Sequence, residues 1–169
     1  MDKNEDTRDL VPIAEELAVA AHRGQVDKAG RDYIDHPRRV AANAQVLAHK
    51  AELPRDASAA VVAAAWLHDV VEDTEVSEAK LRADFPTEVA DAVIAVTRRS
   101  GESPEDYFAR VRSNQFAVLV KTADLADNTD PARQGLLDEE TRTRLGKKYR
   151  RAYELLGVEP EVQGEVSGS

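Results

Sequence analysis

The segment WLHDVVEDT, at positions 66–74, places His68, Asp69, Glu72 and Asp73 directly after a run of small apolar residues. A helix that is apolar on every side is normally buried, and buried charged groups cost free energy unless they find a partner. On one continuous helix these four side chains would share a face about 140° wide. An imidazole together with carboxylates suits a divalent transition ion such as Mn²⁺, Fe²⁺ or Zn²⁺. The alternative interpretation is an exposed helix end with a charged patch.

Two other segments contain polar residues of the same kind. His36 stands at an expected helix start in YIDHPRRVA. In VKTADLADNTDP, Asp124 and Asn128 follow the apolar run 116–120 and lie one helical turn apart. Two apolar helices therefore each carry acids where a core would continue. If they face each other, they build one site together with His36.

Composition limits the classes of protein and of partner. The chain has 169 residues, of which 42% are hydrophobic, 33% charged and only 5% aromatic. This composition is typical of one globular domain of closely packed helices. The net charge of −9 argues against a nucleic-acid partner or an anionic membrane surface, although a small anionic ligand needs only a local cationic pocket. Because the chain has no cysteine, a metal site would have to use histidines and carboxylates.

The hydropathy of the chain bears on its location in the cell. No apolar run approaches the roughly 20 residues of a membrane span. The first ten residues, MDKNEDTRDL, are acidic and contain no apolar signal core. We therefore expect a cytoplasmic protein with no membrane partner.

Helical periodicity and end signals predict an all-α fold of about seven or eight helices. Ser103-Pro104 and Asp138 are typical of helix starts, and Gly157 of a helix end. The run 116–120 could also be read as a strand, but its neighbours favour a helix. The expected helices cover residues 9–23, 35–51, 54–74, 77–85, 87–98, 103–114, 115–127 and 138–156. We expect residues 1–8 to be flexible, residues 9–157 to form the domain, and the polar tail 158–169 to be disordered.

Three motifs in order resemble a known family. AHRGQVDKAGRDYIDHPRRVA, WLHDVVEDT and VKTADLADN are similar to the HD hydrolase domain of the RelA/SpoT family, including its small stand-alone, Mesh1-like members. The resemblance spans about Leu17 to Asn128. It implies a single HD-domain helical bundle that hydrolyses the 3′ (pyro)phosphate of a nucleotide, typically (p)ppGpp to GDP or GTP and pyrophosphate. The implied partner is a small phosphorylated nucleotide.

The resemblance also implies roles for individual residues. Mn²⁺ is the usual ion, and Lys28 and Asn128 match residues that contact the substrate. Glu72 and Asp73 match the acidic pair that activates water and moves protons. The matching metal ligands are His36, His68, Asp69 and Asp124.

The chain departs from the family pattern at three positions. Asp27 stands where an arginine that holds the base and phosphates is common, and Leu125 and Asp127 replace a basic residue and a His or Tyr. We interpret Asp27 as a reversal of charge, and Asp127 as a further negative charge beside an anionic substrate. A different phosphorylated nucleotide, NADPH included, is therefore one alternative. A non-catalytic nucleotide- or metal-binding module and a purely structural bundle are the others.

Overall fold

The computed structural model describes residues 9–160, and within this range the chain forms ten helices and no strand, apart from one isolated bridge between Val26 and Asp32. The all-α prediction is confirmed. The expectations for residues 1–8 and 161–169 lie outside the described residues. The helices are α1 (Leu10–Ala21), α2 (Asp35–Lys50), α3 (Arg55–Leu67), α4 (Val70–Asp73), α5 (Glu78–Asp84), α6 (Thr87–Val96), α7 (Pro104–Arg112), α8 (Gln115–Asn128), α9 (Pro131–Gln134) and α10 (Glu139–Leu156).

The number of helices exceeds the prediction because of two short helices, α4 and α9. The predicted continuous helix through WLHDVVEDT is wrong: α3 ends at Leu67, and His68 and Asp69 form a turn before α4. The Nδ1 atom of His68 lies 2.7 Å from the carbonyl oxygen of Ala65, so the ring competes with the backbone for a helix acceptor. The four polar side chains of this segment therefore do not share one helix face.

Several local signals act as predicted. The side chains of Ser103 and Asp138 accept hydrogen bonds from the third residue of their helices, Asp106 and Thr141. Gly157 ends α10 in the left-handed conformation, with φ of 77°. The run 116–120 lies within α8 and is helical, which resolves the ambiguity between helix and strand.

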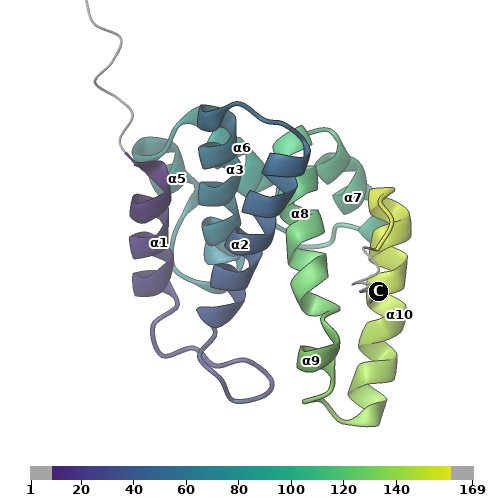
Figure 1. Ribbon diagram of the computed structural model, residues 1–169. Helices are drawn as coiled ribbons and strands as arrows, with labels where there is room; N and C mark the ends of the chain where they lie inside the picture. The colour runs from purple at the N-terminus through teal and green to yellow at the C-terminus, as the bar shows by residue number, and fades with distance from the viewer. Residues whose placement is uncertain (1–8, 161–169) are drawn as a thin grey trace, which may run out of the picture.

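The core is built around α3, which packs against α1, α2, α6 and α8. Residues 60–67 of α3 are all buried, and most of them are alanine or valine. Because small side chains let helix axes approach closely, several helices can surround α3. On the other side of the molecule α8 lies between α2 and the pair α7 and α10 (Figure 1). The N-terminal end of α2 and the C-terminal ends of α3 and α8 thereby meet in one region.

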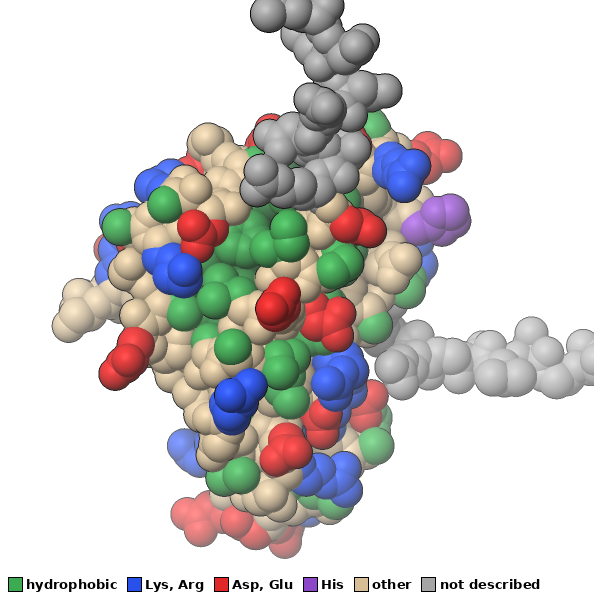
Figure 2. Space-filling view, turned by 90° about the vertical axis from the view of Figure 1, so that its left-hand side faces the viewer, with side chains coloured by type: hydrophobic (Ala, Val, Ile, Leu, Met, Phe, Trp, Pro, Cys, Tyr) green, Lys and Arg blue, Asp and Glu red, His purple; other side chains and the backbone are tan. Residues whose placement is uncertain are grey.

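The surface over α1 mixes apolar patches with charges of both signs (Figure 2). Leu10, Ile13 and Leu17 of α1 line a shallow hollow there with Phe85 and Pro86. No helix within residues 9–160 is both long and apolar enough to cross a membrane.

Candidate metal centre

Four side chains from three separate parts of the chain converge at one point. His36 comes from the first turn of α2, His68 and Asp69 from the turn between α3 and α4, and Asp124 from α8. Nε2 of His36 lies 2.9 Å from Oδ1 of Asp124 and 3.8 Å from Oδ2 of Asp69. Nε2 of His68 lies 3.0 Å from Oδ2 of Asp69 and 3.3 Å from Oδ1 of Asp124. The four residues predicted as metal ligands are therefore brought together.

The donor atoms of this cluster suit a divalent cation. A carbonyl oxygen only accepts hydrogen bonds, so His68 must carry a proton on the Nδ1 atom that faces Ala65. In the neutral ring Nε2 then presents a lone pair to the cluster, and this buried atom makes no well-aligned hydrogen bond within residues 9–160, although the oxygens of Asp69 and Asp124 lie close to it. Ligand atoms of His36, His68 and Asp124 all lie within 4.8 Å of one another. Two imidazole nitrogens with two carboxylates form a donor set that first-row divalent ions favour.

The electrostatic surroundings keep the carboxylates ionised. Burial alone would raise the pKa of Asp69, but His68 outweighs it and lowers this pKa to about 2. Burial is likewise outweighed at Asp124, where Lys121 and the two histidines hold the pKa well below its ordinary value. Burial lowers the pKa of His68, but Asp69 and Asp124 raise it well above 6.5 overall. The raised pKa means that His68 binds a proton readily beside these carboxylates. A divalent cation could take the place of this proton, because it would neutralise the same carboxylates.

Two further side chains hold these carboxylates in place. The hydroxyl group of Tyr33 donates a hydrogen bond to Oδ2 of Asp69. The ammonium group of Lys121 lies 2.9 Å from Oδ2 of Asp124 and is itself largely buried. Each carboxylate ligand candidate therefore has an orienting donor outside the cluster.

A cavity of about 320 Å³ opens directly beside the cluster. His36, Asp69 and Asp124 form one wall. Basic side chains form much of the rest, namely those of Arg98, Lys121, Arg133, Lys148 and Arg151. An apolar wall between α7 and α10 completes the cavity with Pro104, Phe108, Ala152 and Leu155. The cavity thus combines a carboxylate end, a cationic region and an apolar surface, within the volume range of small-ligand sites.

Only Glu72 of the predicted acidic pair lines the cavity, although both Glu72 and Asp73 line a shallow groove beside it. Glu72 lines the cavity and accepts a hydrogen bond from the backbone N–H of Arg98. Partial desolvation raises its pKa and outweighs the opposite effect of that hydrogen bond. Asp73 does not line this cavity but a shallow groove beside it. Ligand atoms of Asp69, Glu72 and Asp73 nevertheless lie within 4.8 Å of one another.

The two predicted substrate-contacting residues differ in position. Asn128 lines the cavity, and its Nδ2 atom lies 3.2 Å from Oδ1 of Asp124. Lys28 is exposed and does not line the cavity. Burial lowers the pKa of Lys148, and the positive charges of Arg98, Lys121 and Lys28 lower it further. Lys28 is thus near enough to influence Lys148 on the cavity wall, but it does not contact the cavity itself.

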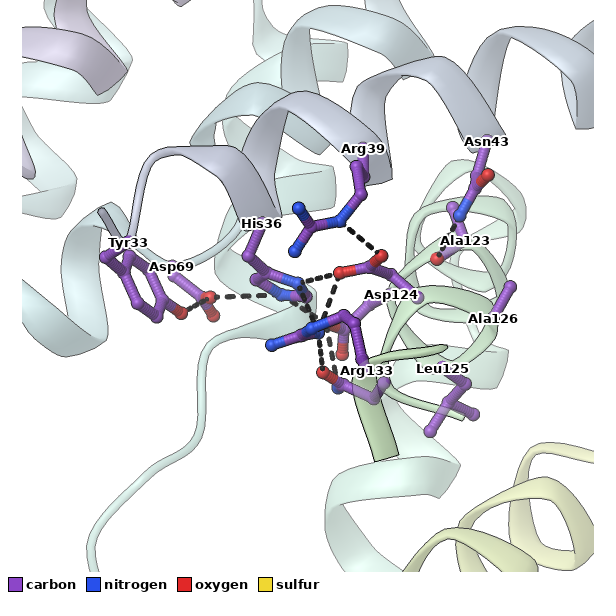
Figure 3. A network of polar contacts seen from close by, with 12 residues as sticks. Tyr33, His36, Arg39, Asn43, Asp69, Ala123, Asp124, Leu125, Ala126 and Arg133 are labelled. Carbon is purple, nitrogen blue, oxygen red and sulfur yellow. Dashed lines mark hydrogen bonds and ion pairs between the residues drawn. The ribbon is translucent and has the colours of Figure 1, made fainter. Parts of the chain in front are cut away.

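The interpretation of Asp127 as a charge beside the substrate is wrong. Its side chain is only 4% exposed and is surrounded by donors from His36, Arg39 and Arg133, whose side chains point toward one another in Figure 3. Oδ2 lies 2.6 Å from Nδ1 of His36 and 2.7 Å from Nη1 of Arg133, and Oδ1 lies 2.7 Å from Nε of Arg39. Its negative charge is neutralised within the protein.

The interpretation of Asp27 also needs correction. Its Oδ1 atom accepts hydrogen bonds from the backbone N–H groups of Ala29 and Arg31, at 2.8 and 3.0 Å. Asp27 does not line the cavity. The carboxylate stabilises the loop that leads to α2 and does not contact a ligand in the cavity directly.

Comparison with known proteins agrees with this arrangement. A family model described as an HD domain matches residues 14–119. The chain belongs to the HD-domain family. This HD-domain protein is 32% identical over 146 residues to the guanosine-3′,5′-bis(diphosphate) 3′-pyrophosphohydrolase of Haemophilus influenzae. The aligned region covers 81% of this chain but only 20% of that enzyme. The chain thus spans about a fifth of the length of that relative.

A smaller relative and a solved structure match more of their own length. The HD-domain protein is 39% identical over 116 residues to the zebrafish (Danio rerio) guanosine-3′,5′-bis(diphosphate) 3′-pyrophosphohydrolase MESH1, covering 64% of this chain and 61% of that one. A structure titled "A metazoan ortholog of SpoT hydrolyzes ppGpp and plays a role in starvation responses" superposes with a TM-score of 0.69. It covers 87% of this chain and 85% of that chain at 24% identity, which supports the shared fold.

Several residues around the metal cluster and its cavity were not predicted from the sequence as site residues. Tyr33 precedes His36 by three residues, a spacing that could have suggested a shared role. Lys121 precedes Asp124 by three residues on the same helix, which is the spacing of an ion pair. Arg98 and Lys148 follow no local pattern, because only packing brings them to the cavity.

Proposed function

We propose that the protein is a Mn²⁺-dependent phosphohydrolase that removes pyrophosphate from the 3′ position of (p)ppGpp, giving GDP or GTP. The observation that carries this proposal is the convergence of His36, His68, Asp69 and Asp124 beside a cavity lined by cationic side chains. A metal-ion site next to a cationic pocket suits a substrate with phosphate groups. The relatives named above are called 3′-pyrophosphohydrolases of guanosine bis(diphosphate), in agreement with this choice.

Hydrolysis replaces one bond to phosphorus with another. Water adds its oxygen to the phosphorus atom next to the ribose, the bond to the 3′ oxygen breaks, and the 3′ oxygen leaves with a proton. A bound Mn²⁺ would act as a Lewis acid that neutralises phosphate charge and activates water. The four proposed ligands would hold this ion, and Tyr33 and Lys121 would orient two of them.

Glu72 is the proposed proton acceptor for the attacking water. It lies on the cavity wall near Asp69, and its raised pKa brings it closer to neutrality, where a general base is most effective. The backbone N–H of Arg98 holds the carboxylate in one orientation. Asp73 lies near Glu72 but outside the cavity, and we assign it a role in passing the proton to solvent.

The remaining side chains of the cavity would bind the nucleotide. Asn128 is positioned to contact it, because its amide lies between Asp124 and Arg133 on the cavity wall. Lys28 would attract the anionic substrate at long range from its exposed loop. The apolar wall formed by Pro104, Phe108 and Leu155 offers a surface for the base.

The test is release of pyrophosphate from ppGpp by the purified protein with Mn²⁺. The His68→Ala/Asp69→Ala double variant is the negative control, because it removes two proposed ligands. Asp91→Asn is a matched control, since Asp91 pairs with Arg82 on the exposed surface. We expect release by the wild type and by Asp91→Asn, and none by the double variant. Equal release by all three proteins would refute the proposed site.

A substrate panel separates the alternatives. NADPH and other phosphorylated nucleotides are assayed beside ppGpp with the same proteins. Turnover of another nucleotide alone would keep the metal centre and replace the substrate. Saturable nucleotide binding without any turnover would identify a binding module.

A further inference from the structure

We propose that Asp127 is a positioning residue that holds the metal-binding ring of His36 in its working orientation. Nδ1 of His36 lies 2.6 Å from Oδ2 of Asp127, on the opposite side of the ring from Nε2, which faces the metal cluster. Nε2 of the same ring lies 2.9 Å from Asp124. The imidazole thus stands between two carboxylates, one inside the cluster and one behind it. This inference rests on the proposed role of His36 as a metal ligand.

The chemistry of imidazole makes such a partner useful. A neutral ring carries its proton on one nitrogen, and only the other nitrogen can bind a metal. A carboxylate that accepts from Nδ1 favours the form with its lone pair on Nε2, which faces the cluster. It also fixes the rotation of the ring and raises the basicity of the metal-binding nitrogen. His68 achieves the same result with the backbone carbonyl of Ala65.

The two arginines explain how Asp127 itself stays fixed. Arg39 comes from α2, one turn after His36, and Arg133 comes from α9. Their side chains are 41% and 28% exposed, whereas that of Asp127 is 4% exposed. A buried carboxylate with two cationic partners and a histidine has little freedom to rotate, because each oxygen already accepts a charge-assisted hydrogen bond.

Arg133 extends this network to the nucleotide pocket. Its Nη1 atom lies 2.7 Å from Oδ2 of Asp127 and 3.2 Å from Oδ1 of Asn128. Arg133 and Asn128 both line the cavity. One guanidinium group therefore orients both the residue behind His36 and the proposed nucleotide contact.

The experiment measures metal binding instead of turnover. Calorimetric titration with Mn²⁺ compares the wild type with Asp127→Leu and Asp127→Asn. We expect the leucine variant to raise the Kd by roughly 10–100-fold, the usual effect of losing such a partner. The asparagine variant should raise it less, because its amide oxygen can still accept from Nδ1. Asp35→Asn is the matched control, since Asp35 neighbours His36 but pairs with Arg38 on the surface. It should keep the wild-type Kd.

A spectroscopic measurement reports on the ring directly. In the protein loaded with diamagnetic Zn²⁺, the Nδ1 proton of His36 should appear as a slowly exchanging downfield resonance. It should be lost in Asp127→Leu and kept in Asp35→Asn.

The outcomes distinguish this inference from the proposed function. An unchanged Kd in Asp127→Leu, or equal losses in both Asp127 variants, would overturn the positioning role while leaving the metal centre intact. If the leucine variant does not fold, a rise of roughly 10–100-fold in the Kd of Asp127→Asn overturns the role by itself, because that variant keeps an acceptor for Nδ1. A wild-type protein that binds neither ion would overturn the metal centre, and the positioning role with it.

Discussion

Nε2 of His36 lies 2.9 Å from Oδ1 of Asp124, although 88 positions separate the two residues in the chain. This contact exists only because α2 and α8 pack side by side. The amide of Asn43 on α2 also reaches α8, where it donates to the backbone oxygen of Ala123 at 3.2 Å. The geometry of the proposed metal centre therefore depends on how closely these two helices approach.

Overpacking between these helices should disturb stability and metal binding together. Ala123 is completely buried and precedes Asp124. Ala123→Leu is expected to destabilise the protein by about 1–3 kcal/mol, because the added methyl groups have no space. It should also weaken Mn²⁺ binding. Urea unfolding and Mn²⁺ titration measure both effects, with Ala109→Leu at an exposed site of α7 as control. Wild-type Mn²⁺ affinity in Ala123→Leu would contradict the dependence on helix packing.

Mn²⁺ should stabilise the folded protein by an amount that grows with the logarithm of its concentration above the Kd. An ion that binds only the folded state adds about 2.7 kcal/mol at a concentration of 100 times its Kd. Thermal unfolding should therefore shift to higher temperature as Mn²⁺ is added. We expect His68→Ala to lose most of this shift, because it removes a buried ligand atom. His49→Ala, at an exposed position on α2, should retain it. A shift of equal size in both variants would show that Mn²⁺ binds elsewhere.

Lys121 should be most important when no metal is bound. Its ammonium group and Asp124 are 12% and 8% exposed, so Lys121→Met leaves a buried carboxylate without its closest cation. Breaking such a pair costs about 3–5 kcal/mol. Mn²⁺ should reduce this loss, since it supplies positive charge to the same carboxylate. Urea unfolding with and without Mn²⁺ measures the difference.

The control for Lys121 is a lysine in an exposed pair. Lys80 pairs with Asp84 at the same 2.8–2.9 Å range, but both side chains are about half exposed. Lys80→Met should therefore change stability by less than about 1 kcal/mol. A loss for Lys121→Met as small as that of the control would refute the account of Asp124.

The acid stability of the protein should depend partly on Glu102. Arg110 donates to the backbone oxygens of Ile94, Ala95 and Thr97 at the end of α6, and Glu102 pairs with the same guanidinium. This hydrogen bond lowers the pKa of Glu102 below its ordinary value of 4.5. Because the folded-state pKa is the lower one, its stabilising contribution is complete above pH 4.5 and is lost as pH falls through the folded-state pKa.

Glu102→Gln tests this sign directly. The wild type should be more stable than the variant at pH 7, and the difference should shrink as the pH falls below 4.5. Thermal unfolding across this pH range measures it, with Glu88→Gln in the exposed first turn of α6 as control. A difference that grows toward acidic pH would contradict the assigned pairing.

The candidate metal ligands and most helix boundaries could be predicted from the sequence alone. Ser103, Asp138 and Gly157 act through contacts within a few positions of the chain, so their effects can be read locally. His36, His68, Asp69 and Asp124 could be proposed because three motifs occur in a family's order. The all-α fold followed from periodicity, which is also a local property.

Of the unusual acids, Asp127 has a role that depends on helix packing, whereas the contacts of Asp27 are local. Asp27 and Asp127 are both aspartates at departures from the family pattern, yet one caps turns of its own loop and the other lies behind His36. The effect of a carboxylate is set by the donors within about 3 Å of it, and for Asp127 those donors include residues 88 and 91 positions away. Such distances along the chain are closed by helix packing, which no local sequence pattern specifies.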